Sequence, residues 1–141
     1  MNNLIAVTIG DIKGIGIELL IKSLEKKEVN NFVLFCNYKI ISSYLKKNNK
    51  IIKINITNKD NKIQFKNYCL NIYNYKTNNT YENTIKSIDL AYTLCKKNMF
   101  IGMITLPIRK DLIIKHVKNN FIGHTEYLQE LDKKDTSNMI L

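Results

Sequence analysis

The apolar residues of this chain are spaced in two ways, which predict strands and helices in turn. Runs of branched and aromatic side chains at residues 4–9, 32–36 and 99–105 predict buried strands. Apolar residues that recur every three or four positions predict helices at residues 15–27, 38–47, 81–98, 110–118 and 125–134. Shorter strands are predicted at residues 52–56, 63–65 and 68–73, with a loop over residues 74–79.

The alternation of strands and helices predicts the fold class. Strands separated by helices form parallel sheets whose faces are covered by the connecting helices. We therefore expect an α/β protein built as a layered open sheet with helices on both faces. The apolar residues 139–141 look like the opening of one more strand. We accordingly expect residues 1–141 to be the N-terminal portion of a larger protein, truncated where that strand begins.

Glycine and proline are scarce, and their positions mark junctions where a ligand could bind. The chain has five Gly and one Pro, whereas an average chain of this length carries roughly ten Gly. Three of the glycines follow the first predicted strand, Pro107 follows the strand at 99–105, and Gly123 lies directly before His124. Open α/β sheets bind their ligands at such carboxyl ends of strands.

The formal net charge of +10 raises the question of a nucleic-acid partner. Many lysines occur as pairs near predicted helix ends, such as Lys26-Lys27 and Lys96-Lys97, where cations favour the helix dipole. Aromatic residues are not interleaved with them as a base-stacking surface requires. We therefore expect a solvated basic surface without a nucleic-acid partner. A non-catalytic basic binding module is the alternative.

Cysteine usage and hydropathy set the expected compartment. Cys36, Cys69 and Cys95 lie far apart beside apolar neighbours, which predicts buried thiols, and no CxxC spacing indicates a metal site. No apolar run is long enough to span a membrane, and the first residues lack a signal-peptide pattern. We expect a soluble, cytoplasmic protein with no membrane partner.

Two stretches that follow predicted strands carry candidate chemistry, and each has a structural alternative. The glycine-rich loop within residues 8–18 either cradles phosphate with backbone N–H groups or forms a tight turn. Its G-x3-G-x-G spacing is neither the dinucleotide nor the Walker A pattern. The second stretch, with Thr105, Pro107 and Lys110, is either an anion site or a plain strand-to-helix turn with an exposed lysine.

A third stretch, Gly123-His124-Thr125-Glu126, stands where a predicted helix begins. Imidazole, hydroxyl and free backbone N–H groups could converge there into a phosphate or carboxylate pocket. The alternative is that Thr125 is a simple N-cap and that His124 is exposed. The other histidine, His116, is predicted to be a surface residue, and two histidines so far apart do not indicate a metal site.

Taken together, the three stretches resemble the N-terminal half of the 4-hydroxythreonine-4-phosphate dehydrogenase family of pyridoxal phosphate biosynthesis. That family carries T-P-G-D/E-P-x-G-I-G-P-E, then T-x-P-x-x-K, then G-H-T-E. The positions that this chain keeps are Thr8, Gly10, Asp11, Gly14, Ile15, Gly16, Glu18, Thr105, Pro107, Lys110, Gly123, His124, Thr125 and Glu126.

The resemblance implies a fold, an activity and part of a site. The fold is expected to be similar to that of isocitrate and isopropylmalate dehydrogenases, with two lobes and a cleft shared by the subunits of a homodimer. The family oxidises 4-phosphooxy-L-threonine with NAD, with loss of carbon dioxide, and a divalent metal polarises the hydroxyl. By resemblance His124 and Thr125 bind the substrate, with Lys110 as a further contact. Catalytic and cofactor-binding residues stay unassigned.

The departures from the family pattern limit what this chain can do alone. Ile9, Ile12 and Ile17 replace prolines, which makes the first loop less rigid, and Leu106 replaces a small residue. The metal-binding histidines of the family would lie beyond Leu141, so the chain is expected to lack metal ligands and to be inactive alone. A dehydrogenase of another phosphorylated four-carbon acid would fit the same motifs.

Overall fold

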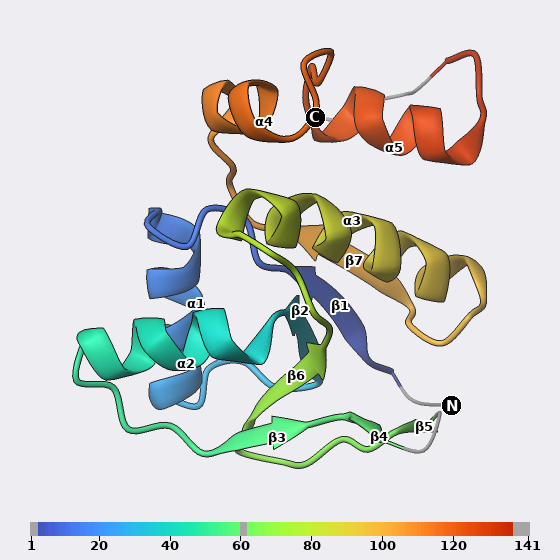
Figure 1. Ribbon diagram of the computed structural model, residues 1–141. Helices are drawn as coiled ribbons and strands as arrows, with labels where there is room; N and C mark the ends of the chain where they lie inside the picture. The colour runs from blue at the N-terminus through green and yellow to red at the C-terminus, as the bar shows by residue number, and fades with distance from the viewer. Residues whose placement is uncertain (1–2, 60–61, 137–141) are drawn as a thin grey trace.

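A computed structural model describes residues 3–59 and 62–136, and its centre is a parallel sheet. The five strands follow the order β3-β6-β2-β1-β7 (Figure 1). Their bounds are β1 (Ile5–Thr8), β2 (Phe32–Cys36), β3 (Ile54–Ile56), β6 (Leu70–Asn74) and β7 (Gly102–Thr105). All four pairings between them are parallel. A separate antiparallel pair is formed by β4 (Asn58–Lys59) and β5 (Lys62–Ile63).

Helices cover both faces of the sheet, as the sequence predicts. Their bounds are α1 (Ile15–Glu25), α2 (Tyr38–Lys47), α3 (Thr80–Lys96), α4 (Lys110–His116) and α5 (His124–Asp132). The first two helices pack on one face and α3 packs on the other, while α4 and α5 lie on the far side of α3 (Figure 1). The predicted α/β fold class with a largely parallel sheet is confirmed.

Three groups of buried side chains hold these layers together. Ile17 and Ile21 of α1 belong to the first group, together with residues of α2 and of one sheet face. Ala91 and Leu94 of α3 belong to the second, on the opposite face. The third group joins α3 to the last two helices and consists of Ile85, Ile88, Ile113, Phe121 and Tyr127.

The central strand β2 shows why an unbroken apolar run can be a strand. All five of its residues are buried, with exposed fractions between 0 and 6%, because β1 and β6 flank it and helices cover both faces. Strands of parallel sheets that are buried on both faces lack the usual apolar-polar alternation.

The predicted strand at residues 99–105 is shorter and less buried than its sequence suggests. The strand β7 starts only at Gly102 and lies at the edge of the sheet. Phe100 is buried, but the side chains of Ile101 and Ile104 are 65% and 51% exposed. The expectation of a fully buried strand is therefore wrong, because no described strand pairs with the outer edge of β7.

Several other boundaries shift by a few residues. The strand predicted at residues 52–56 begins at Ile54, and the one at 63–65 is reduced to the two residues of β5. The helix α1 ends at Glu25 rather than at Lys27. The strand expected at residues 139–141 lies outside the described part of the chain.

The expectations for cysteine are confirmed in part. Cys36 and Cys69 are buried free thiols, whereas the free thiol of Cys95 is only half-buried. In residues 3–59 and 62–136, no helix has the length and apolar character that crossing a membrane requires.

Candidate anion site at the start of the last helix

The glycine loop and the proline turn lie directly against each other. The backbone N–H of Asp11 donates a hydrogen bond to the carbonyl of Pro107 over 2.8 Å. A Cβ placed on Gly16 would lie 2.7 Å from Cδ of Pro107. A Cβ on Gly10, which has φ of +62°, would lie 2.5 Å from the carbonyl oxygen of Pro107. The two glycines therefore allow a close approach of two segments that are far apart in the sequence.

The free N–H groups expected in the glycine loop are partly used within the loop itself. The N–H of Lys13 donates to the Asp11 carboxylate over 3.0 Å, and the N–H of Gly14 donates to the Asp11 carbonyl over 2.9 Å. These bonds form a tight turn. Of the two interpretations of this loop, the structure favours the structural turn.

Pro107 lies in the turn after β7 and does not open a helix. The helix α4 begins three residues later at Lys110, and its N-cap is Arg109. The guanidinium of Arg109 pairs with the Asp111 carboxylate over 2.6 and 2.9 Å. The side chain of Lys110, in contrast, is directed toward the start of α5.

The helix α5 begins at His124, and its first turn has no side-chain cap. Its N-cap is Gly123 in an extended conformation, which offers no side-chain acceptor to the first backbone N–H groups. Thr125 is the second residue of the helix, so the alternative in which it is a simple N-cap is wrong. The first turn thus presents uncapped N–H groups and the positive end of the helix dipole.

Lys110 and His124 come together at this helix start. A Cβ placed on Gly123 would lie 3.3 Å from Nζ of Lys110, so the ammonium group lies over the N-cap of α5. The Nε2 atom of His124 is buried and has no hydrogen-bond partner in the described part of the chain. Burial, and secondly the charge of Lys110, hold the pKa of His124 below its ordinary value.

Lys110 forms no direct ion pair with the described part of the protein. Among the described residues, no carboxylate lies within 4.0 Å of the Lys110 ammonium. The carboxylate of Glu126 lies nearby, because one of its oxygens would be 3.0 Å from a Cβ on Gly123. A cation at the positive end of a helix is unfavourable unless an anion accompanies it. The arrangement is therefore suited to bind an anion between Lys110 and the first turn of α5.

Contacts with α3 fix the position of α5. The Tyr127 hydroxyl donates a hydrogen bond of 2.6 Å to the Asp89 carboxylate. Phe121 and Tyr127 also pack with Ile113 of α4 and with two isoleucines of α3. The helix start is consequently held on a packed scaffold rather than on a free loop.

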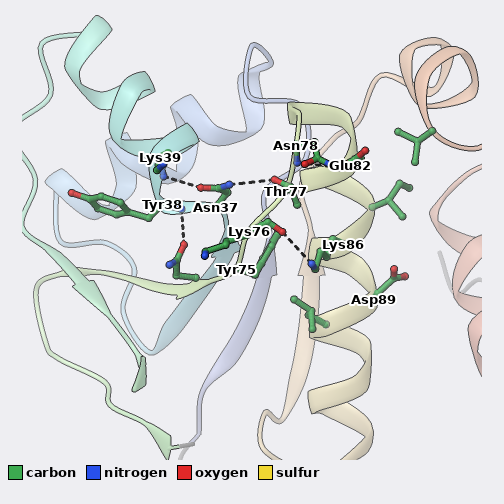
Figure 2. Close-up of a pocket in the computed structure, with 14 residues that line it drawn as sticks. Asn37, Tyr38, Lys39, Tyr75, Lys76, Thr77, Asn78, Glu82, Lys86 and Asp89 are labelled. Atoms are coloured by element: carbon green, nitrogen blue, oxygen red, sulfur yellow. Dashed lines mark hydrogen bonds between the residues drawn. The ribbon is translucent and has the colours of Figure 1, made fainter. Parts of the chain in front are cut away.

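Sequence reasoning missed a cavity of about 800 Å³, which lies elsewhere. It lies where β2 and β6 end, and residues of α2, of α3 and of the segment after β6 line it (Figure 2). A signal was present, because Asn37 and Asn74 stand at the carboxyl ends of these two strands. The sequence stretch after β6 was expected to be only a loop.

Neither histidine belongs to a metal site in the described residues. His116 lies exposed at the end of α4, as expected, and its ring stacks on Tyr81 with centroids 4.4 Å apart. No group of three or more His, Cys, Asp or Glu side chains is placed to hold a metal ion within residues 3–59 and 62–136. These residues therefore offer no ligand set for the divalent metal that the family resemblance implies.

Comparison with known proteins identifies relatives that are more than twice as long. A 4-hydroxythreonine-4-phosphate dehydrogenase of Sulfurimonas denitrificans is 28% identical over 150 aligned positions, covering 96% of this chain and 43% of its own length. The chain therefore spans less than half of this curated relative.

Solved structures with the same fold come from related enzymes. A 4-hydroxythreonine-4-phosphate dehydrogenase of Klebsiella pneumoniae matches 93% of this chain and 45% of its own with a TM-score of 0.80 and 22% identity. A putative enzyme of that name from Salmonella typhimurium matches 95% of this chain and 46% of its own, with a TM-score of 0.81 and 17% identity. The expected isocitrate/isopropylmalate dehydrogenase-like fold is thereby confirmed.

The family itself is shown by a match over most of the chain. The family model described as pyridoxal phosphate biosynthetic protein PdxA matches residues 26–141. The sequence motifs and the shared fold agree with this match. The chain belongs to the PdxA family of pyridoxal phosphate biosynthetic proteins.

Proposed function

We propose that this chain supplies part of the substrate site of a 4-hydroxythreonine-4-phosphate dehydrogenase, which oxidises 4-phosphooxy-L-threonine in pyridoxal phosphate biosynthesis. The observation that carries the proposal is the position of the Lys110 ammonium, which has no carboxylate within 4.0 Å among the described residues, beside His124 at the uncapped start of α5. Phosphate and carboxylate groups are the anions that such a helix start binds. A phosphorylated hydroxy amino acid carries both.

Each residue of the site has a distinct role in this proposal. The ammonium of Lys110 contacts an anionic group as a point charge. Because its pKa is lowered, His124 is mostly neutral near pH 7 and uses its buried Nε2 atom to hydrogen-bond the substrate. The half-buried Thr125, on the first turn of α5, adds a hydroxyl.

The oxidation itself requires groups outside this site. A cofactor of the NAD type accepts the hydride in such a reaction. The three residues above bind and orient the substrate and take no part in hydride transfer. We propose that the complete enzyme binds NAD and a divalent metal, carries out the decarboxylation step and forms a homodimer. The 141-residue chain is inactive alone.

We further propose that the chain forms the N-terminal portion of a larger, two-lobed dehydrogenase. The edge strand β7 supports this, because its outer side has no partner strand among the described residues. Ile104 in this strand and Ile101 directly before it are more than half exposed. Exposed strand edges with apolar side chains are normally covered in a complete protein.

Calorimetric titration of the chain with 4-phosphooxy-L-threonine tests the substrate site. We expect binding that Lys110→Met and His124→Asn each weaken by about tenfold or more, since a hydrogen bond to a charged group contributes about 1.5–3 kcal/mol. Lys115→Met and His116→Asn, on the exposed side of α4, are matched controls and should leave affinity unchanged. Unaltered binding by the first two variants would contradict the proposal.

Two additional measurements separate the finer parts of the proposal. Tighter binding of a phosphorylated four-carbon hydroxy acid that lacks the amino group would favour the alternative substrate class. NADH formation is expected to be absent when the chain is mixed with 4-phosphooxy-L-threonine, NAD and a divalent metal. Clear turnover would show that the chain is active alone.

A further inference from the structure

The cavity at the ends of β2 and β6 has no role in the function proposed above. Its volume is about 800 Å³, and none of Lys110, His124 and Thr125 lines it. Sites for small molecules typically have volumes of about 300–1,000 Å³. The cavity also lies at the carboxyl ends of parallel strands, where open α/β sheets bind their ligands.

The wall formed by α2 is fixed by side-chain amides. The N–H of Tyr38 donates to the Asn74 side chain over 2.8 Å, and the N–H of Asn37 donates to Asn83 over 2.8 Å. The Asn37 side chain caps α2 by accepting from the N–H of Lys39 over 3.0 Å. The backbone of this helix start is thus already occupied, so a ligand would be bound by side chains of a preorganised wall.

Three lysines line the cavity without a carboxylate partner among the described residues. Lys39 lies on α2, Lys76 follows β6 and Lys86 lies on α3 (Figure 2). In the described residues, none of them has a carboxylate within 4.0 Å of its ammonium. Lys86 donates to the carbonyl of Lys76 over 3.1 Å, whereas no hydrogen bond to the described part of the chain restrains the ammonium groups of Lys39 and Lys76.

The two carboxylates of the lining are engaged with other groups. Glu82 accepts a hydrogen bond from the N–H of Asn78 over 3.1 Å, and Asp89 accepts one from the Tyr127 hydroxyl over 2.6 Å. Burial raises the pKa of Asp89, and the hydrogen bond from Tyr127 opposes this effect. Three lysines against two carboxylates leave one formal positive charge around the cavity.

Apolar side chains complete the lining. Ile85 and Leu90 of α3 and Val117 after α4 face the same cavity as the lysines. Ile85 is 8% exposed and belongs to the core between α3 and α4, whereas Val117 is 38% exposed. A ligand that matches this lining carries an anionic end and an apolar body.

We propose that this cavity binds a small phosphate ester, with the phosphate held by Lys39 and Lys76 and the organic part against Ile85 and Leu90. Lysines contact phosphate as point charges and need no fixed geometry. This second anion site is independent of the site at Lys110 and His124, and either one can fail without the other.

Phenyl phosphate is a suitable probe, because it combines one phosphate with one apolar ring. NMR titration of methyl-labelled protein should shift the methyl signals of Ile85, Leu90 and Val117. Inorganic phosphate should bind at least threefold more weakly, since it lacks the apolar body. The double variant Lys39→Met/Lys76→Met should weaken phenyl phosphate binding about tenfold or more.

Matched variants separate this site from general charge effects. Lys97→Met/Lys115→Met removes the same charge from exposed positions outside the cavity, and Lys110→Met removes the lysine of the other site. Both should change affinity less than twofold. The proposal is overturned if the protein does not bind phenyl phosphate, or if the Lys97/Lys115 control weakens binding equally. Loss of binding in Lys110→Met alone, or tighter binding of a random oligonucleotide at the same methyl groups, would also overturn it.

Discussion

At Gly16 the structure leaves no room for a side chain. The Cβ of an alanine would come within 2.7 Å of Cδ of Pro107 and 3.1 Å of Cβ of Leu106. Neither contact could be recognised from the sequence, because about ninety positions separate the two segments. The scarcity of glycine did indicate that this position matters, but only the fold distinguishes a close packing contact from a phosphate loop.

The substitution Gly16→Ala should therefore destabilise the protein by about 1–3 kcal/mol, because overpacking forces the proline turn to move. Gly102→Ala is the matched control, since a Cβ there meets no atom within 4 Å. Urea denaturation of both variants measures the difference. Equal stability of Gly16→Ala and the unchanged protein would show that the turn does not pack against α1 as described.

Lys110 and His124 form the second residue pair whose relation only the structure reveals. Lys110→Met should raise the pKa of His124, because the lysine charge contributes to lowering it. NMR titration of the imidazole measures this shift, and Lys115→Met serves as the control of equal charge. An unchanged pKa of His124 in Lys110→Met would contradict the proximity of the two groups.

The lowered pKa of His124 also determines how the stability of the protein depends on pH. The folded-state pKa of His124 lies below its value in the unfolded chain, so the unfolded chain binds more protons as the pH falls below about 6.5. The contribution of His124 to stability is present above that pH and is lost as the pH falls through the folded pKa. Lys110→Met should make this loss smaller.

Helices were predicted more accurately than strands because their signal is local. The spacing of apolar residues identified all five helices of the described chain, and the bounds of α2 agree at both ends. Strand burial depends on neighbours, so the edge position of β7 could not be predicted from its apolar sequence. The end of α1 also depends on a single backbone angle, since Lys27 has φ of 59°.

Lys27 provides a test of how α1 ends. A left-handed backbone costs a residue with a side chain roughly 1–2 kcal/mol, whereas glycine loses about 0.5–1 kcal/mol of unfolded-state entropy. Lys27→Gly should thus stabilise the protein by up to about 1 kcal/mol. Lys26→Gly should destabilise it, because Lys26 has φ of −78°. Thermal unfolding measures the stability of both variants. A less stable Lys27→Gly than Lys26→Gly would contradict the left-handed conformation of Lys27 at the end of α1.

For the whole molecule, the order of elements was sufficient to predict the fold class. The sequence also predicted that residues 105–110 and 123–126 carry chemistry, and the fold brings Lys110 over Gly123. It did not reveal the cavity at Asn37 and Asn74, because asparagines after strands are indistinguishable from ordinary turn residues until the strands are aligned. Local patterns thus explain what could be predicted, and long-range pairing explains what could not.

In the function that we propose, Lys110, His124 and Thr125 bind one anionic substrate at the start of α5. The most direct measurement is NMR titration of the His124 ring in the presence and absence of saturating 4-phosphooxy-L-threonine. A bound phosphate or carboxylate should raise the pKa of His124, because it offsets the charge of Lys110 and supplies a partner for Nε2. His116 should titrate identically in both samples. If the substrate binds while the His124 signals and pKa stay unchanged, the substrate site lies elsewhere and the proposed role of His124 is wrong.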